Sequence, residues 1–124
     1  MEKLYQKHRE QADFLFVYIQ EAHPSDGWQV DDNEKDKVVF PDPTTWNERR
    51  QRAQECVTRL GITMPCVVDT MDNKVDTLYA AWPERIFVID REGKIVYAGG
   101  QGPFGFKPTE AKKALKQGLR KSRQ

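Results

Sequence analysis

Residues 14–28, FLFVYIQEAHPSDGW, contain the pattern that decides the fold. Residues 14–19 form an almost continuous run of aromatic and β-branched side chains, which is typical of a short strand buried on both faces. Strands of that kind belong to parallel sheets, and an open α/β sheet binds its ligands at the carboxyl ends of its strands. Glu21, His23 and Asp26 follow this strand directly, so the sequence predicts proton-carrying side chains at that edge.

Length and charge set the limits of the interpretation. A chain of 124 residues predicts one domain. Its 20 basic and 19 acidic residues are largely interspersed, so we expect no nucleic-acid interface. Cys56 and Cys66 are too few for a disulfide scaffold or a zinc site and favour a reducing compartment. Because no apolar segment has the length of a signal or a membrane span, we expect a soluble, cytoplasmic protein.

The remaining elements follow from periodicity and from start and stop signals. Residues 20–43 are polar and rich in proline, which indicates a long functional loop. Thr45 and Glu48 match a capping box, and Gly61 is a typical helix stop. The pattern predicts strands over 14–19, 65–69, 86–90 and 94–98, the last two as an antiparallel hairpin, and helices over 2–12, 45–60, 71–81 and from Pro108 onward.

Two helices carry further predictions. In the helix over 71–81 we expect Val75, Leu78 and Tyr79 to point inward. The helix over 2–12 has no capping residue or early proline before it, as if the chain were joined in mid-helix.

Four segments, in this order, resemble the iodothyronine deiodinases, which are selenoenzymes of thioredoxin-like fold that remove iodine from thyroid hormones. The resemblance covers nearly the whole chain from about residue 10, and its first segment is the most specific. The segments are residues 18–28 (YIQEAHPSDGW), 67–73 (VVDTMDN), 78–85 (LYAAWPER) and 93–103 (GKIVYAGGQGP).

The resemblance implies roles for four residues. Those matching Tyr18, Glu21 and His23 surround the selenocysteine and help to relay protons, and the arginine matching Arg85 helps to hold the substrate. The chemistry suits these roles, because histidine titrates near neutrality, a carboxylate can orient its imidazole, and arginine can clamp a carboxylate or phenolate. From the residues alone, a surface histidine, a core tyrosine and an exposed arginine remain alternatives.

The sequence also departs from the family pattern. Residues 41–46 lack the second functional histidine of the family, and Met64 stands where the family has a resolving cysteine. Cys66 lies two positions further on, on the same strand face, and is a candidate redox thiol. The alternative is that Cys66 is a small buried apolar residue, and Cys56 is expected to be structural.

The largest departure concerns the first strand of a thioredoxin-like fold. That strand lies between the strands over 14–19 and 86–90, and the selenocysteine or cysteine nucleophile stands at its end. Neither is found in this sequence. We therefore expect an α/β, thioredoxin-like fold that lacks its central strand and the start of its first helix, as a reading frame restarted after a selenocysteine codon would produce.

The resulting prediction is a deiodinase-like oxidoreductase domain whose nucleophile lies upstream of Met1. The expected partners are a small halogenated aromatic substrate or a peroxide, and a thiol reductant. We expect no metal, cofactor or membrane contact in this chain, and a homodimer remains open. Two alternatives are a thioredoxin-like binding module without chemistry and a peroxiredoxin-like enzyme that uses Cys66.

Overall fold

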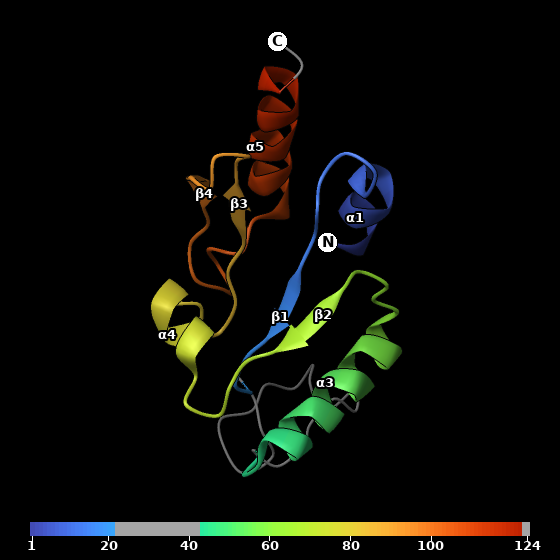
Figure 1. Ribbon diagram of the computed structural model, residues 1–124, viewed down its shortest axis with the longest axis vertical. Coiled ribbons are helices and arrows are strands. Elements are labelled where there is room, and N and C mark those ends of the chain that lie inside the picture. The colour runs from blue at the N-terminus through green and yellow to red at the C-terminus, as the bar shows by residue number, and fades with distance from the viewer. Residues whose placement is uncertain (22–42, 123–124) are drawn as a thin grey trace. The chain divides into compact units, whose positions relative to one another are not determined.

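The computed structural model describes residues 1–21 and 43–122 (Figure 1). The chain divides into two compact units, unit 1 with residues 1–13 and 81–124 and unit 2 with residues 14–80. The described elements are α1 (Glu2–His8), β1 (Phe16–Tyr18), α3 (Trp46–Leu60), β2 (Cys66–Val68), α4 (Lys74–Tyr79), β3 (Phe87–Ile89), β4 (Ile95–Ala98) and α5 (Pro108–Lys121). The predicted mixture of helices and strands is confirmed, while the thioredoxin-like arrangement and the single domain stay predictions.

Unit 2 is built on the parallel pair of β1 and β2, as the sequence predicts for the first strand. Phe16 pairs with Cys66, and Tyr18 pairs with Val68. In Figure 1 the long helix α3 runs alongside β2, which it contacts. β1 is shorter than predicted, and only its last residue, Tyr18, is buried. The prediction of a strand buried on both faces is therefore wrong.

Helix α3 begins and ends where local chemistry predicts. The side chain of Thr45 accepts a hydrogen bond from the backbone N–H of Glu48, and the Glu48 carboxylate in turn accepts one from the backbone N–H of Thr44. Gly61 ends the helix in the left-handed conformation, with a φ of 64°. Ala53, 3% exposed, marks the buried side of the helix, so α3 is fixed at both ends and along one face.

Helix α4 differs from the prediction. It spans only Lys74–Tyr79. Its Leu78 is 73% exposed and its Tyr79 36% exposed, so the expected inward position is wrong for these two residues, whereas Val75 is half-buried. The polar Asp76 is instead the buried residue of this helix. A helix of six residues has few intrahelical hydrogen bonds, so its position depends on the polar contacts at its start.

Unit 1 contains the predicted antiparallel hairpin. Phe87 pairs with Ala98, and the turn is closed by hydrogen bonds between Asp90 and Lys94. Helix α5 contacts both strands and buries Ala111, which is 2% exposed. α1 is shorter than predicted, because it ends at His8 in a turn. No helix within residues 1–21 and 43–122 is both long and apolar enough to cross a membrane.

Candidate functional site

The carboxyl ends of β1 and β2 gather polar side chains at one edge of unit 2. Gln20 and Glu21 follow β1, and Asp69 follows β2. The backbone N–H of Asp69 donates to the carbonyl of Tyr18 over 2.9 Å, so the two strand ends lie side by side. Parallel pairing therefore brings together residues that are far apart in the sequence, as expected for the binding edge of an α/β sheet.

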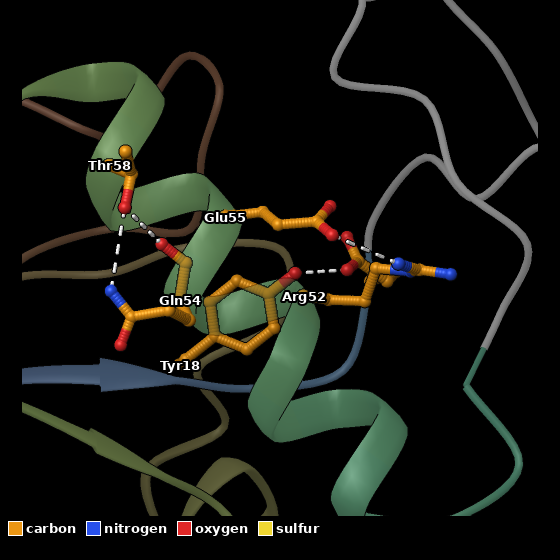
Figure 2. A network of polar contacts seen from close by, with 6 residues as sticks. Tyr18, Arg52, Gln54, Glu55 and Thr58 are labelled. Carbon is orange, nitrogen blue, oxygen red and sulfur yellow. Dashed lines mark hydrogen bonds and ion pairs between the residues drawn. The ribbon is translucent and has the colours of Figure 1, made fainter.

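Tyr18 and Glu21 form the first pair at this edge. The Tyr18 hydroxyl donates to the Glu21 carboxylate, and the phenol ring lies against α3 (Figure 2). Burial, the hydrogen bond to Glu21 and the charge of Glu21 raise the pKa of Tyr18 well above its ordinary value, and the nearby Arg52 opposes this only in part. The phenol therefore stays protonated at neutral pH and acts as a fixed donor to the carboxylate.

Arg52 supplies positive charge near this pair from α3. It forms an ion pair with Glu55, one turn further along the helix, over 3.6 Å (Figure 2). The same close-up shows the Tyr18 hydroxyl on the side of α3 where Arg52 lies. The phenol, the carboxylate and the guanidinium thus provide a donor, an acceptor and a charge at the same strand end.

Asp69 is the most strongly held side chain of the edge. It is 2% exposed, and its carboxylate accepts backbone N–H groups from Thr70 over 2.8 Å and from Val75 and Asp76 over 3.0 Å each. Burial would raise the pKa of Asp69, but these three hydrogen bonds and the positive charge of Arg49 outweigh it and lower the pKa. Asp69 therefore stays ionised and caps the start of α4 from outside the helix.

Two further contacts lock the same region. The buried guanidinium of Arg49, 4% exposed, donates to the Thr70 carbonyl over 2.7 Å. Gln20 donates through its amide to the Asp76 carboxylate over 2.6 Å. The segment after β1 is thereby tied to α4 just before Glu21, which restricts where the Glu21 side chain lies.

Four residues of this edge were not predicted from the sequence as site residues: Gln20, Arg49, Asp69 and Asp76. Only Asp69 carried a usable signal, since an acidic residue directly after a buried strand resembles the pattern that singled out Glu21. Arg49 is part of a charged helix in sequence, and nothing in its neighbours marks it as buried.

The two thiols of the chain also belong to unit 2. Cys66 lies on β2 and Cys56 on α3, both partly buried and both free. Burial raises the pKa of both thiols, and the charges of Glu21 and Cys66 raise that of Cys56 further. Both are therefore protonated at neutral pH, which is not the state of an activated nucleophile.

Arg85 belongs to unit 1. Its Nε donates to the Gly99 carbonyl over 2.7 Å, and its guanidinium lies 4.7 Å from the centre of the Phe87 ring. The structure thus brings together Tyr18 and Glu21 of the predicted site residues and places Cys66 on the neighbouring strand. His23 lies outside the described residues. Within residues 1–21 and 43–122, no group of three His, Cys, Asp or Glu side chains could hold a metal ion.

Comparison with known proteins gives a consistent family. The family described as iodothyronine deiodinase matches residues 1–118. A thyroxine 5-deiodinase of Gallus gallus is 44% identical over 107 residues, which are 86% of this chain and 39% of the relative. A type II iodothyronine deiodinase of Homo sapiens is 35% identical over 121 residues, 96% of this chain and 44% of the relative.

A type I iodothyronine deiodinase of Xenopus laevis is 37% identical over 106 residues, 86% of this chain and 40% of the relative. The chain thus spans about two fifths of the length of these curated relatives. The match to the family nevertheless extends over almost all of the chain, including both units. This chain therefore belongs to the iodothyronine deiodinase family.

Proposed function

We propose that the chain is part of an oxidoreductase domain of thioredoxin-like fold that removes iodine reductively from iodothyronines or other halogenated phenols. In this proposal the nucleophile, a selenocysteine or a cysteine, lies upstream of Met1. The observation that carries the proposal is the hydrogen bond of Tyr18 to Glu21 at the carboxyl end of β1. The relatives are named as deiodinases of thyroxine and of iodothyronines, which supports this class of substrate.

The proposed reaction moves one proton and two electrons. A selenolate or thiolate attacks the iodine of the aryl iodide, the carbon–iodine bond breaks, and the ring carbon takes up a proton. The products are the deiodinated ring and a selenenyl or sulfenyl iodide. Two thiol molecules then reduce that iodide to the selenol or thiol, forming a disulfide and releasing hydrogen iodide.

In this reaction Glu21 serves the proton transfer. His23 delivers the proton to the ring carbon, and the Glu21 carboxylate orients its imidazole. The Tyr18 phenol, whose raised pKa keeps it protonated, fixes the carboxylate by donating to it. Gln20, bound to Asp76, fixes the backbone just before Glu21. The support for these roles is that Tyr18 binds the carboxylate while Gln20 fixes the residue before it.

Arg85 is proposed to hold the substrate through its carboxylate or phenolate. Its contacts with Gly99 and the Phe87 ring fix the plane of the guanidinium. A planar guanidinium of fixed orientation is suited to a charged oxygen, because its N–H groups form a rigid fork.

One alternative from the sequence, a redoxin that uses Cys66, receives less support. A thiol that reduces peroxide rapidly enough for an enzyme at neutral pH needs a lowered pKa, whereas burial raises the pKa of Cys66. The other alternative is a binding module without chemistry. It predicts no released iodide in the activity test, whereas the proposal predicts deiodination.

The test uses a protein that includes the segment upstream of Met1, supplied with an iodothyronine and a small thiol, and measures released iodide. We expect Glu21→Gln to lower kcat about 100-fold, the smaller end of the usual range for general acid–base groups, with little change in KM. The control is Glu92→Gln, which changes an exposed carboxylate of the hairpin turn and is expected to leave kcat unchanged.

Full activity of Glu21→Gln would contradict the proposed role of the carboxylate, and no activity of the longer protein would favour the binding module. The 124-residue chain alone is expected to show negligible turnover in the same assay. Robust deiodination by that chain would contradict a nucleophile upstream of Met1.

A further inference from the structure

The two cysteines of unit 2 lie on elements that pack against each other. Cys66 pairs with Phe16 across the parallel strands, and Phe16 and Tyr18 share one face of β1 because they are two residues apart. Paired residues of neighbouring strands also share a face, so Cys66 lies on the Tyr18 face of β2. The Tyr18 ring lies against α3 (Figure 2), so Cys66 is also on the side of the strands that α3 contacts.

Cys56 approaches the same place from α3. It is three residues after Ala53, which is 3% exposed and marks the face of α3 that is buried. The register and the helix face therefore place Cys66 and Cys56 on the sides of β2 and α3 that contact each other. Cys66 also contributes to the raised pKa of Cys56, which agrees with this placement.

We propose that Cys56 and Cys66 are a redox-active thiol pair, which a peroxide oxidises to an intramolecular disulfide joining α3 to β2. In the first step one thiol, as its thiolate, attacks the peroxide, breaks the oxygen–oxygen bond and becomes a sulfenic acid. The second thiol then displaces water and forms the sulfur–sulfur bond. For hydrogen peroxide, two thiols and one peroxide give one disulfide and two waters.

The position of the pair gives the disulfide a structural consequence. Cys56 belongs to α3, against which the Tyr18 ring lies, so the bond forms on the side of the strands that holds the Tyr18 and Glu21 pair. The raised pKa of both thiols makes the reaction slow at neutral pH and faster as the pH rises, because only the thiolate attacks. The proposal does not depend on the deiodinase activity, since it concerns only thiols within this chain.

The chain is well suited to a direct test by peptide mapping. Cleavage after Lys and Arg separates the two cysteines, because Cys56 falls in peptide 53–59 and Cys66 in peptide 60–74. The reduced 124-residue chain is treated with hydrogen peroxide, the remaining thiols are alkylated, and the monomer is digested and analysed by mass spectrometry. We expect peptides 53–59 and 60–74 to appear joined, with loss of two hydrogen atoms, and to separate on reduction.

Two controls make the result specific to the folded chain. Cysteines ten residues apart also meet in an unfolded chain, so the oxidation is repeated in concentrated urea, where we expect the joined peptide to make up a smaller share of the oxidised products. Cys56→Ser and Cys66→Ser are each expected to abolish the joined peptide in the monomer. The proposal is overturned if the native monomer yields only separately oxidised or alkylated peptides, if the disulfide joins two chains, or if urea leaves the share of the joined peptide equal or higher.

Discussion

Replacement of Asp69 by asparagine tests the network that holds the strand ends. Asparagine has nearly the same shape, but one carboxylate oxygen becomes an amide nitrogen, which cannot accept a hydrogen bond. In the native structure one carboxylate oxygen accepts the N–H groups of Thr70 and Val75, and the other accepts the N–H of Asp76. Whichever oxygen is replaced, at least one backbone N–H then faces the amide NH₂ group, which is itself a donor. Since Asp69 is 2% exposed, water cannot easily replace the lost acceptor.

The magnitude follows from the number of bonds affected. Leaving a buried donor unsatisfied costs about 1–3 kcal/mol, and the surviving bonds weaken because their acceptor loses its charge. We therefore expect Asp69→Asn to lower the free energy of unfolding by about 2–4 kcal/mol, a large share of the roughly 5–15 kcal/mol of a typical domain. Urea unfolding followed by circular dichroism measures the change as a lower midpoint.

The matched control is Asp13→Asn, an exposed aspartate at which we expect a change within about 0.5 kcal/mol. An Asp69→Asn variant as stable as that control would refute the argument that the three backbone hydrogen bonds hold the region together.

The pH dependence of the same residue provides a second readout. The pKa of Asp69 in the folded chain is lower than the ordinary value of 3.8, so the unfolded chain binds the proton more readily. Its contribution to stability is therefore complete above about pH 4 and is lost as the pH falls through the folded pKa. The difference between wild type and Asp69→Asn is expected to shrink below that pH. A difference that stayed constant would contradict the assignment of the effect to the ionised carboxylate.

Two further substitutions test separate features by urea unfolding. Tyr18→Phe removes the buried donor to Glu21 and is expected to lower the free energy of unfolding by about 0.5–1.5 kcal/mol. Its control is Tyr97→Phe, which removes a solvent-exposed hydroxyl and is expected to have no measurable effect. Equal effects of the two variants would argue against the buried hydrogen bond. Gly61→Ala places a side chain at a φ of 64° with no atom nearby and is expected to cost about 1 kcal/mol from backbone strain alone. Gly118→Ala, in the interior of α5, is expected to stabilise the chain by about 0.5–1 kcal/mol. If both substitutions changed the free energy of unfolding in the same direction, the explanation by backbone conformation would be refuted.

Local signals in the sequence predicted the elements well. The capping box of Thr45 and Glu48, the stop at Gly61 and the turn before Lys94 all depend on residues within four positions of each other. Their physical causes lie in the neighbouring backbone, so the sequence contains the information directly.

Long-range contacts could not be predicted in the same way. Arg49 reaches the carbonyl of Thr70, 21 residues away, and Gln20 reaches Asp76, 56 residues away. Both side chains are ordinary polar residues in their own segments, and only the packing of α3 and the pairing of β1 with β2 decide that they meet. The wrong prediction for Leu78 has the same origin. The contacts at the start of α4 bury Asp76, while Leu78 and Tyr79 remain exposed.

The titratable groups at this edge have different capacities for chemistry. Asp69 is held ionised by backbone N–H groups that cannot move without unfolding the start of α4, so its carboxylate is committed to structure. Tyr18 is held protonated by its burial and by the carboxylate it serves. Glu21 instead receives its bond from a side chain, and it stands where the chain leaves the strand. Of these three groups, Glu21 is therefore the one whose carboxylate is positioned by a neighbouring side chain at the end of the strand, and the activity test should begin with it.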